Sequence, residues 1–161
     1  MRQVLVYRHA KAEKSDGDIP DRKRRLLPRG RRQCESIGAQ LAERGLLPDA
    51  VITSPAVRAR ETADRTAASA GFSGAITEAD TLYDATPRTY LSVLQDLPDD
   101  TERIMLVGHN PTVEEFVEHA SGQSSRMKTA HLAVLETDLA SWRDLAPDTR
   151  FTVADYLEPE E

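Results

Sequence analysis

The hydrophobic positions of the first 121 residues follow two alternating spacings. Short continuous hydrophobic runs predict four buried strands, at residues 4–6, 50–53, 75–78 and 104–107. After each run, hydrophobic residues recur every three or four positions, which predicts helices that begin near residues 28, 54, 86 and 110. Strands that alternate with helices form a mostly parallel sheet with helices on both faces. The pattern therefore predicts a doubly wound α/β fold.

Three of the predicted helices begin with a polar residue followed by proline. The pairs are Ser54-Pro55, Thr86-Pro87 and Asn110-Pro111. A short polar side chain can accept a hydrogen bond from the free N–H groups of a helix start, and proline suits the first helical position. We therefore expect the first residue of each pair to be an N-cap.

The alternation of strands and helices ends at about residue 121. Three further stretches read as strands with no room for helices between them: residues 132–135, the stretch around Trp142, and residues 151–156. We expect them to be antiparallel edge strands near the C-terminus. No linker, repeat or low-complexity segment interrupts the chain, so residues 1–161 are expected to form a single domain.

Composition narrows the class of protein. The chain is 39% hydrophobic and 30% charged, and its net charge of −6 disfavours nucleic acid or an anionic membrane surface as a partner. No hydrophobic run approaches the ~20 residues that span a bilayer, and we expect no signal peptide because the first strand follows almost at once. Cys34 is the only cysteine, which excludes an internal disulfide, and its place on a helical stripe predicts a buried side chain. We expect a cytoplasmic protein.

A basic run follows the first strand. Seven of the eleven residues from Arg22 to Arg32 are Lys or Arg. Such a run is usually a solvated face. Because it lies close to the first strand end, it could also attract an anionic substrate to that point. The sequence leaves both interpretations open.

Cationic residues and histidines follow three of the predicted strands. Arg8 and His9 end the first strand, Arg58 lies near the start of the second helix, and His109 follows the strand at 104–107. Ligands of open α/β sheets bind at the carboxyl ends of the strands. Arginine forks match phosphate oxygens, and helix N-termini favour anions. The sequence therefore predicts a site for a phosphoryl group, with Arg60 pointing elsewhere because it lies about 200° further around the helix.

Three motifs resemble the signatures of the histidine phosphatase superfamily. They are Arg8-His9-Ala10, Ser54-Pro55-x-x-Arg58-Ala59-x-x-Thr62-Ala63 and Gly108-His109-Asn110-Pro111. The short length and the spacing are most similar to the SixA-like phosphohistidine phosphatase branch. Further positions match that branch: Asp21, Arg24, Leu26, Gly30, Leu82-Tyr83 and the strand at 133–136. Two positions depart from it, since Leu27 replaces a capping hydroxyl and His131 a small residue.

The resemblance implies a phosphatase that needs no metal or other cofactor. His9 would be the nucleophile and form a covalent phosphohistidine, with its second ring nitrogen held by a backbone carbonyl. Arg8, Arg58 and His109 would hold the phosphoryl oxygens. We expect the substrate to be phosphohistidine on a protein, because the chain lacks insertions that would close over a small molecule.

The roles of three other residues are less sharply defined. Arg24 and Asn110 are expected to contribute to substrate binding. Asp84 stands where phosphoester-cleaving members of the superfamily have a glutamate acid, and it is one methylene shorter, so we expect at most weak proton donation. Two alternatives remain open: a phosphatase for a small phosphorylated molecule, and a phosphate-binding module without catalysis.

Overall fold

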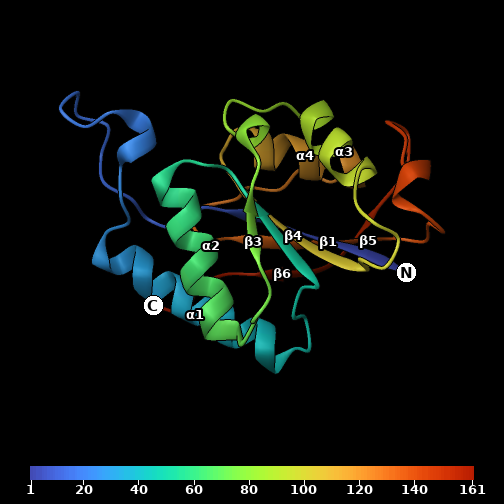
Figure 1. The fold of residues 1–161 in the computed structure, drawn as a ribbon, viewed down its shortest axis with the longest axis horizontal. Helices are drawn as coiled ribbons and strands as arrows, with labels where there is room; N and C mark the ends of the chain where they lie inside the picture. Colours follow the sequence, from blue (N-terminus) through green and yellow to red (C-terminus); the bar gives the residue numbers. More distant parts are fainter.

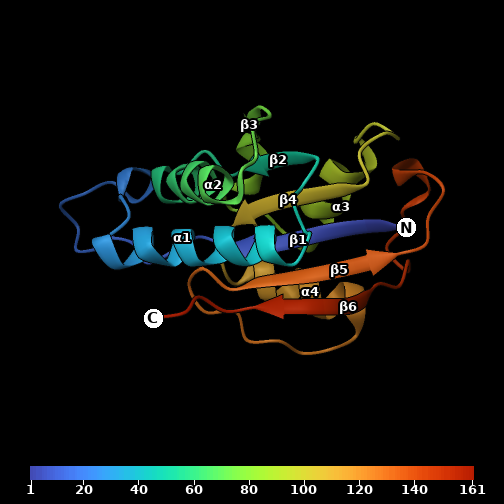
Figure 2. The same ribbon diagram turned by 90° about the horizontal axis from the view of Figure 1, so that it is seen from below.

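Six strands form one mixed sheet in this computed structural model, which describes residues 1–161 (Figures 1 and 2). The strands are β1 (Arg2–Arg8), β2 (Ala50–Thr53), β3 (Ile76–Glu78), β4 (Arg103–Gly108), β5 (Leu132–Thr137) and β6 (Thr152–Leu157). They lie in the order β3-β2-β4-β1-β5-β6. The first four are parallel, and β5 and β6 are added antiparallel at the β1 side. The predicted α/β class, with antiparallel strands near the C-terminus, is confirmed.

Four helices cover the two faces of the sheet. They are α1 (Pro28–Glu43), α2 (Val57–Ala70), α3 (Pro87–Gln95) and α4 (Thr112–Ser121). Side chains of a strand alternate between faces. Leu5 and Tyr7 of β1 therefore pack with residues of α1 and α2, and Val4 and Val6 pack with residues of α3 and α4. Figure 1 shows these two helix pairs below and above the sheet.

The predicted helix caps are correct at one of the three proline pairs. Thr86 caps α3, and its side chain forms a capping box with Thr89. The predictions for Ser54 and Asn110 are wrong, because α2 and α4 begin later, at Val57 and Thr112. The side chains of Ser54 and Asn110 bond to groups far away in the sequence, which are described below, and Ser54 Oγ also accepts from the nearby Ala56 N–H at 3.3 Å.

The stretch around Trp142 is also not the strand that was predicted. Trp142–Asp144 forms a short 3-10 helix that follows β5. The indole of Trp142 is fully buried, and its Nε1–H donates to the Thr101 carbonyl at 2.7 Å. The hydrophobic signal that predicted a strand here comes from the buried Trp142 side chain alone. The prediction that Cys34 is buried is confirmed.

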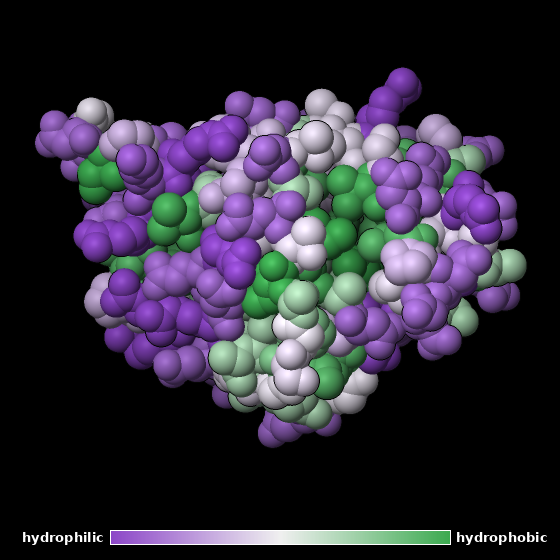
Figure 3. All heavy atoms as spheres, viewed as in Figure 1, coloured by the Kyte–Doolittle hydropathy of each residue, from purple (hydrophilic) through white to green (hydrophobic).

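The pairing of the central strands fixes which residues meet at their carboxyl ends. Arg8 of β1 lies opposite Gly108 of β4, so His9 and His109 follow on neighbouring strands. A Cβ atom at Gly108 would clash with the Tyr90 hydroxyl, which explains the glycine before His109. Figure 3 shows hydrophilic side chains on the left of its face, where the segment after β1 lies, and hydrophobic ones mainly along the middle. No helix is both long and apolar enough to cross a membrane.

Candidate active site

The residues predicted to bind a phosphoryl group come together at the carboxyl ends of β1 and β4. A cavity of about 300 Å³ is lined by the side chains that were predicted from four separate segments: Arg8, His9, Arg24, Arg58, His109 and Asn110. The rings of His9 and His109 lie 5.2 Å apart between their centres. Asp84 lies in a second cavity of about 330 Å³, which shares Arg58, His109 and Asn110 with the first.

His9 is held as a neutral imidazole. Its side chain is 8% exposed, and its Nδ1 lies 2.8 Å from the Ala10 carbonyl oxygen. A carbonyl can only accept, so Nδ1 carries the proton and Nε2 keeps its lone pair. Nε2 has no hydrogen-bond partner within the protein. Burial lowers the pKa of His9 to about 3, with the charges of His109, Arg58 and Arg8 acting in the same direction. The predicted backbone contact is confirmed.

The depressed pKa of His9 predicts a loss of stability in mild acid. Below pH 6.5 the unfolded chain gains a proton on this residue, which the folded chain excludes until about pH 3, so stability falls as the pH falls between these values. We expect the free energy of unfolding in phosphate-free buffer to drop between pH 7 and pH 5 by about 2 kcal/mol more in the wild type than in His9→Gln. Urea denaturation measures this, with His119→Gln as an exposed control. Equal drops in wild type and His9→Gln would contradict it.

A threonine of α2 ties this helix to the segment that carries His9. The Thr62 hydroxyl accepts from the Ala10 N–H at 3.0 Å and donates to the Arg58 carbonyl at 2.6 Å. The first turns of α2 are therefore fixed against the end of β1. The two hydrogen bonds of Thr62 thereby help to hold Arg58 beside the cavity of His9.

The two predicted phosphate clamps are both anchored to the protein. Arg58 is 5% exposed and donates to Asp21 through both terminal nitrogens, at 2.7 Å to the carbonyl and 3.1 Å to the carboxylate. Arg8 donates to the Met127 carbonyl at 3.1 Å, and burial lowers its pKa. Arg60 points away, as predicted, and pairs with carboxylates on the surface.

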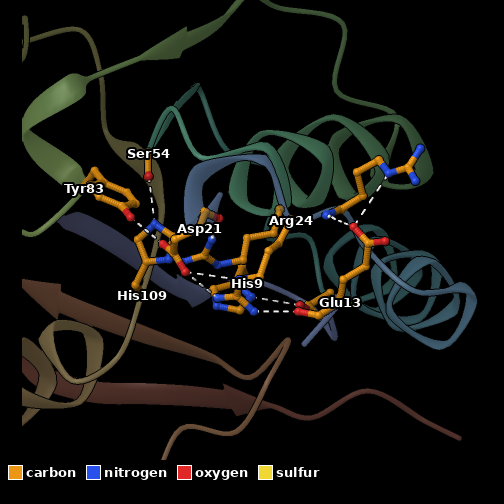
Figure 4. A network of polar contacts seen from close by, with 10 residues as sticks. His9, Glu13, Asp21, Arg24, Ser54, Tyr83 and His109 are labelled. Atoms are coloured by element: carbon orange, nitrogen blue, oxygen red, sulfur yellow. Dashed lines mark hydrogen bonds and ion pairs between the residues drawn. The ribbon is translucent and has the colours of Figure 1, made fainter. Parts of the chain in front are cut away.

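Asp21 is the main residue that sequence reasoning left without a role. Its carboxylate accepts from the Tyr83 hydroxyl, from Arg24 Nε at 3.1 Å and from Arg58. The hydrogen bond from Tyr83 is the largest cause that lowers the pKa of Asp21 to about 2, and Arg58 and Arg24 add to it. Figure 4 shows Asp21 between Tyr83 and Arg24. Its only sequence signal is the match of Asp21 and Tyr83 to the family pattern.

His109 is oriented by a serine that was predicted to cap a helix. Its Nε2 lies 2.8 Å from Ser54 Oγ, and its Nδ1 is buried without a partner (Figure 4). The Tyr83 ring packs edge-on against the imidazole, with ring centres 5.6 Å apart. Burial lowers the pKa of His109 to about 4, and Arg58 lowers it further. Asn110 donates to the same Met127 carbonyl as Arg8, at 2.8 Å, while its Oδ1 has no partner.

The basic run fits both interpretations left open by the sequence. Arg22 stacks over the Tyr83 ring at 4.2 Å, and Arg24 pairs with Asp21 at 3.0 Å, so these two lie at the rim of the site. The other ion pairs of the run join Arg25 to Glu13, which also lines the cavity of His9, and, outside that cavity, Arg29 to Glu161 and Arg31 to Glu61. Arg22 and Arg24 therefore bring positive charge to the rim of the site, whereas Arg29 and Arg31 belong to a solvated face.

The second cavity carries three carboxylates, of which Asp21 is paired with Arg58 and Arg24. Asp84, whose backbone has a positive φ of 55°, faces it together with Glu115 of α4. Sequence reasoning did not identify Glu115, whose only signal is its place in the first turn of the helix after His109. No group of three or more His, Cys, Asp or Glu side chains is arranged to hold a metal ion.

Comparisons with known proteins place this geometry in a family. Residues 4–85 match the sequence pattern of the histidine phosphatase superfamily (branch 1). An uncharacterized protein of Mycobacterium tuberculosis is 32% identical over 151 residues, which cover 87% of this chain and 92% of the relative.

Two solved structures illustrate the range of the fold. A SixA protein of Agrobacterium tumefaciens, described as a candidate phosphohistidine phosphatase, is 31% identical and superposes over 99% of both chains with a TM-score of 0.82. A mycobacterial glucosyl-3-phosphoglycerate phosphatase is 13% identical and shares the fold, over 95% of this chain and 97% of its own, with a TM-score of 0.71. With its paired histidines and arginines at the strand ends, this chain belongs to the histidine phosphatase superfamily and is SixA-like.

Proposed function

We propose that this protein hydrolyses phosphohistidine through a covalent phosphohistidine intermediate on His9. The observation that carries the proposal is the state of His9. Its Nδ1–H is tied to the Ala10 carbonyl, so the lone pair of Nε2 is available in a cavity lined by Arg8, Arg58 and His109. A neutral imidazole with one fixed nitrogen is prepared for nucleophilic attack, whereas phosphate binding alone requires only the cations.

The first step transfers the phosphoryl group to the enzyme. The lone pair of His9 Nε2 forms a bond to phosphorus as the bond to the substrate nitrogen breaks, and the leaving imidazole keeps that electron pair and takes up a proton from water. Arg8, Arg58 and His109 hold the three oxygens that do not take part in the displacement. Positioning and charge stabilisation supply most of the catalysis of phosphoryl transfer, and the buried guanidinium of Arg58 with the half-buried one of Arg8 is suited to both.

The second step returns His9 to its starting state. Water attacks phosphorus on the side from which the substrate left, the bond to His9 Nε2 breaks, and inorganic phosphate is released. The proton of the attacking water passes to solvent or to the phosphate. Because the low pKa of His9 favours the neutral imidazole, His9 leaves with its proton on Nδ1 and a free lone pair on Nε2, ready for another turnover.

The cavity beside the phosphoryl site favours a nitrogen leaving group. It shares Arg58 and His109 with the cavity of His9. Its carboxylates are Asp21, which is paired with Arg58 and Arg24, and Asp84 and Glu115, which form no ion pair. The two carboxylates without an ion pair favour a leaving group that gains positive charge, and the imidazole of phosphohistidine does so when its ring is protonated. An alkoxide gains negative charge instead. The alternative, a small phosphoester substrate, has in its favour the fold shared with a glucosyl-3-phosphoglycerate phosphatase.

A leaving-group series tests this choice. We expect kcat/KM to be high for phosphohistidine and aryl phosphates and low for alkyl phosphates, because an alkoxide needs a proton donor that a short, solvent-facing Asp84 supplies poorly. Asp84→Asn should slow alkyl phosphates more than phosphohistidine. Glu118→Gln, which changes an exposed carboxylate on α4 outside the cavities of the site, is the control and should leave the turnover of both substrates unchanged. A wild type that turns over alkyl and aryl esters alike would favour the phosphoester alternative.

A further inference from the structure

A third cavity adjoins the one that holds His9. It has a volume of about 390 Å³, and Thr129 lines both cavities. None of its lining residues is hydrophobic. Three of them are cations, namely Arg29 at the start of α1 and Arg126 and Lys128 of the loop before β5. A cavity of this composition suits an anion and not an apolar ligand.

An acidic segment of the chain itself already lies on this basic wall. Residues 158–161, Glu-Pro-Glu-Glu, follow β6, whose last residue Leu157 is level with Leu132 and so with the end of β1. The segment therefore leaves the sheet at the same edge as His9 (Figure 2). Arg29 pairs with Glu161 at 2.5 and 2.8 Å.

Backbone bonds hold the same segment along α1. Gln40 donates to the Glu158 carbonyl at 2.8 Å, and the Glu160 N–H donates to Ser36 Oγ at 2.8 Å. An extended acidic peptide therefore fits here both by charge and by backbone hydrogen bonding. Residues 158–161 thus show that this surface can hold an extended peptide with carboxylate side chains.

Two cations of the wall remain uncompensated. Arg126 and Lys128 line the cavity but make no ion pair, although acidic residues outnumber basic ones in the chain by 27 to 21. Their loop also supports the catalytic cavity, because the carbonyl of Met127 between them accepts from both Arg8 and Asn110. A carboxylate bound by Arg126 or Lys128 would therefore lie next to the phosphoryl clamp.

We propose that this cavity docks an acidic segment of the phosphorylated protein substrate, a few residues away from its phosphohistidine, and that residues 158–161 compete with that segment. The inference rests on the proposed function and names a feature of its substrate. Charges at the rim of an interface act on encounter and recognition more than on the chemical step, so docking should lower KM and leave kcat unchanged. It should also weaken as the salt concentration rises.

Two matched phosphohistidine peptides test the docking site, one with glutamates beside the phosphohistidine and one with glutamines. We expect Arg126→Glu and Lys128→Glu each to lower kcat/KM for the acidic peptide about tenfold, through KM, since each reversal replaces an attraction by a repulsion. Turnover of the neutral peptide and of p-nitrophenyl phosphate should stay within about twofold. Arg143→Glu, at an exposed arginine away from the three cavities, is the control and should change none of these values.

A second variant removes the competitor. Glu158→Gln combined with Glu160→Gln and Glu161→Gln should raise kcat/KM for the acidic peptide and not for the neutral one. An unchanged value, or a wild type that does not distinguish the two peptides, would overturn the proposal.

Direct binding separates this proposal from the proposed function. Fluorescence anisotropy with the acidic peptide lacking phosphate should show a Kd about tenfold weaker for Lys128→Glu than for Arg143→Glu. If no phosphohistidine peptide is hydrolysed while this difference remains, the proposed function fails and the docking site stands. If phosphohistidine is hydrolysed and the two Kd values agree, the docking site fails alone.

Discussion

We expect His9→Ala to abolish turnover and to leave the binding of a phosphate analogue intact. Without the imidazole no covalent intermediate can form, so we expect kcat/KM to fall by more than about a thousandfold for every substrate. Arg8, Arg58 and His109 are unchanged in this variant and continue to bind vanadate or phosphate. Steady-state kinetics and isothermal titration calorimetry with vanadate measure the two effects separately.

The matched control for this variant is another histidine. His119 is exposed on α4 and its Nε2 contacts the Pro147 carbonyl at 2.9 Å, away from the cavities of the site. His119→Ala should keep wild-type turnover. Activity within tenfold of wild type in His9→Ala would rule out His9 as the nucleophile.

We expect Arg58→Ala to produce the second large loss of activity, and Arg60→Ala almost none. Arg58 is buried beside His9 and His109, whereas Arg60 lies on the surface and pairs with Asp64 and Glu78. Removing one preorganised charge donor costs about 2–4 kcal/mol of transition-state stabilisation, or about 30- to 1,000-fold in kcat/KM. The surface ion pairs of Arg60 are worth at most about 1 kcal/mol of folding stability.

Two further measurements sharpen the test of Arg58. Arg58→Lys keeps the charge but loses the planar fork, so its activity should lie between those of wild type and Arg58→Ala. Arg58→Ala removes a buried partner of Asp21, so folding has to be checked separately from activity. Circular dichroism should show that Arg58→Ala, Arg58→Lys and Arg60→Ala all fold. Equal losses in Arg58→Ala and Arg60→Ala would contradict the assignment of the clamp.

The central part of the site could be predicted because it depends on short-range pattern. The hydrophobic runs locate the ends of β1 and β4, and parallel strands end at one edge, so His9 and His109 could be placed at the same edge. That β1 and β4 are neighbours is seen only in the structure. Helical spacing likewise predicts that Arg58 and Arg60 point in different directions from α2. These inferences need only the period of each element.

The rest of the site depends on contacts that no local pattern reveals. Ser54 and Asn110 have the residue type and the following proline of an N-cap, but bonds to His109 and to the Met127 carbonyl compete for their side chains. Asp21 reaches Arg58 from a short 3-10 helix 37 residues earlier in the chain. Its position follows from tertiary folding, and no periodicity marks it.

The trapping of the enzyme intermediate tests the central claim most directly. Wild-type protein is mixed with a ³²P-labelled phosphohistidine peptide, quenched in alkali within milliseconds to preserve the acid-labile P–N bond, and digested for mass spectrometry. The account predicts transient label on the imidazole of His9, formed and lost at rates that match turnover, and no label in His9→Ala. Hydrolysis of the peptide without label on His9, or with label on another residue, would contradict it.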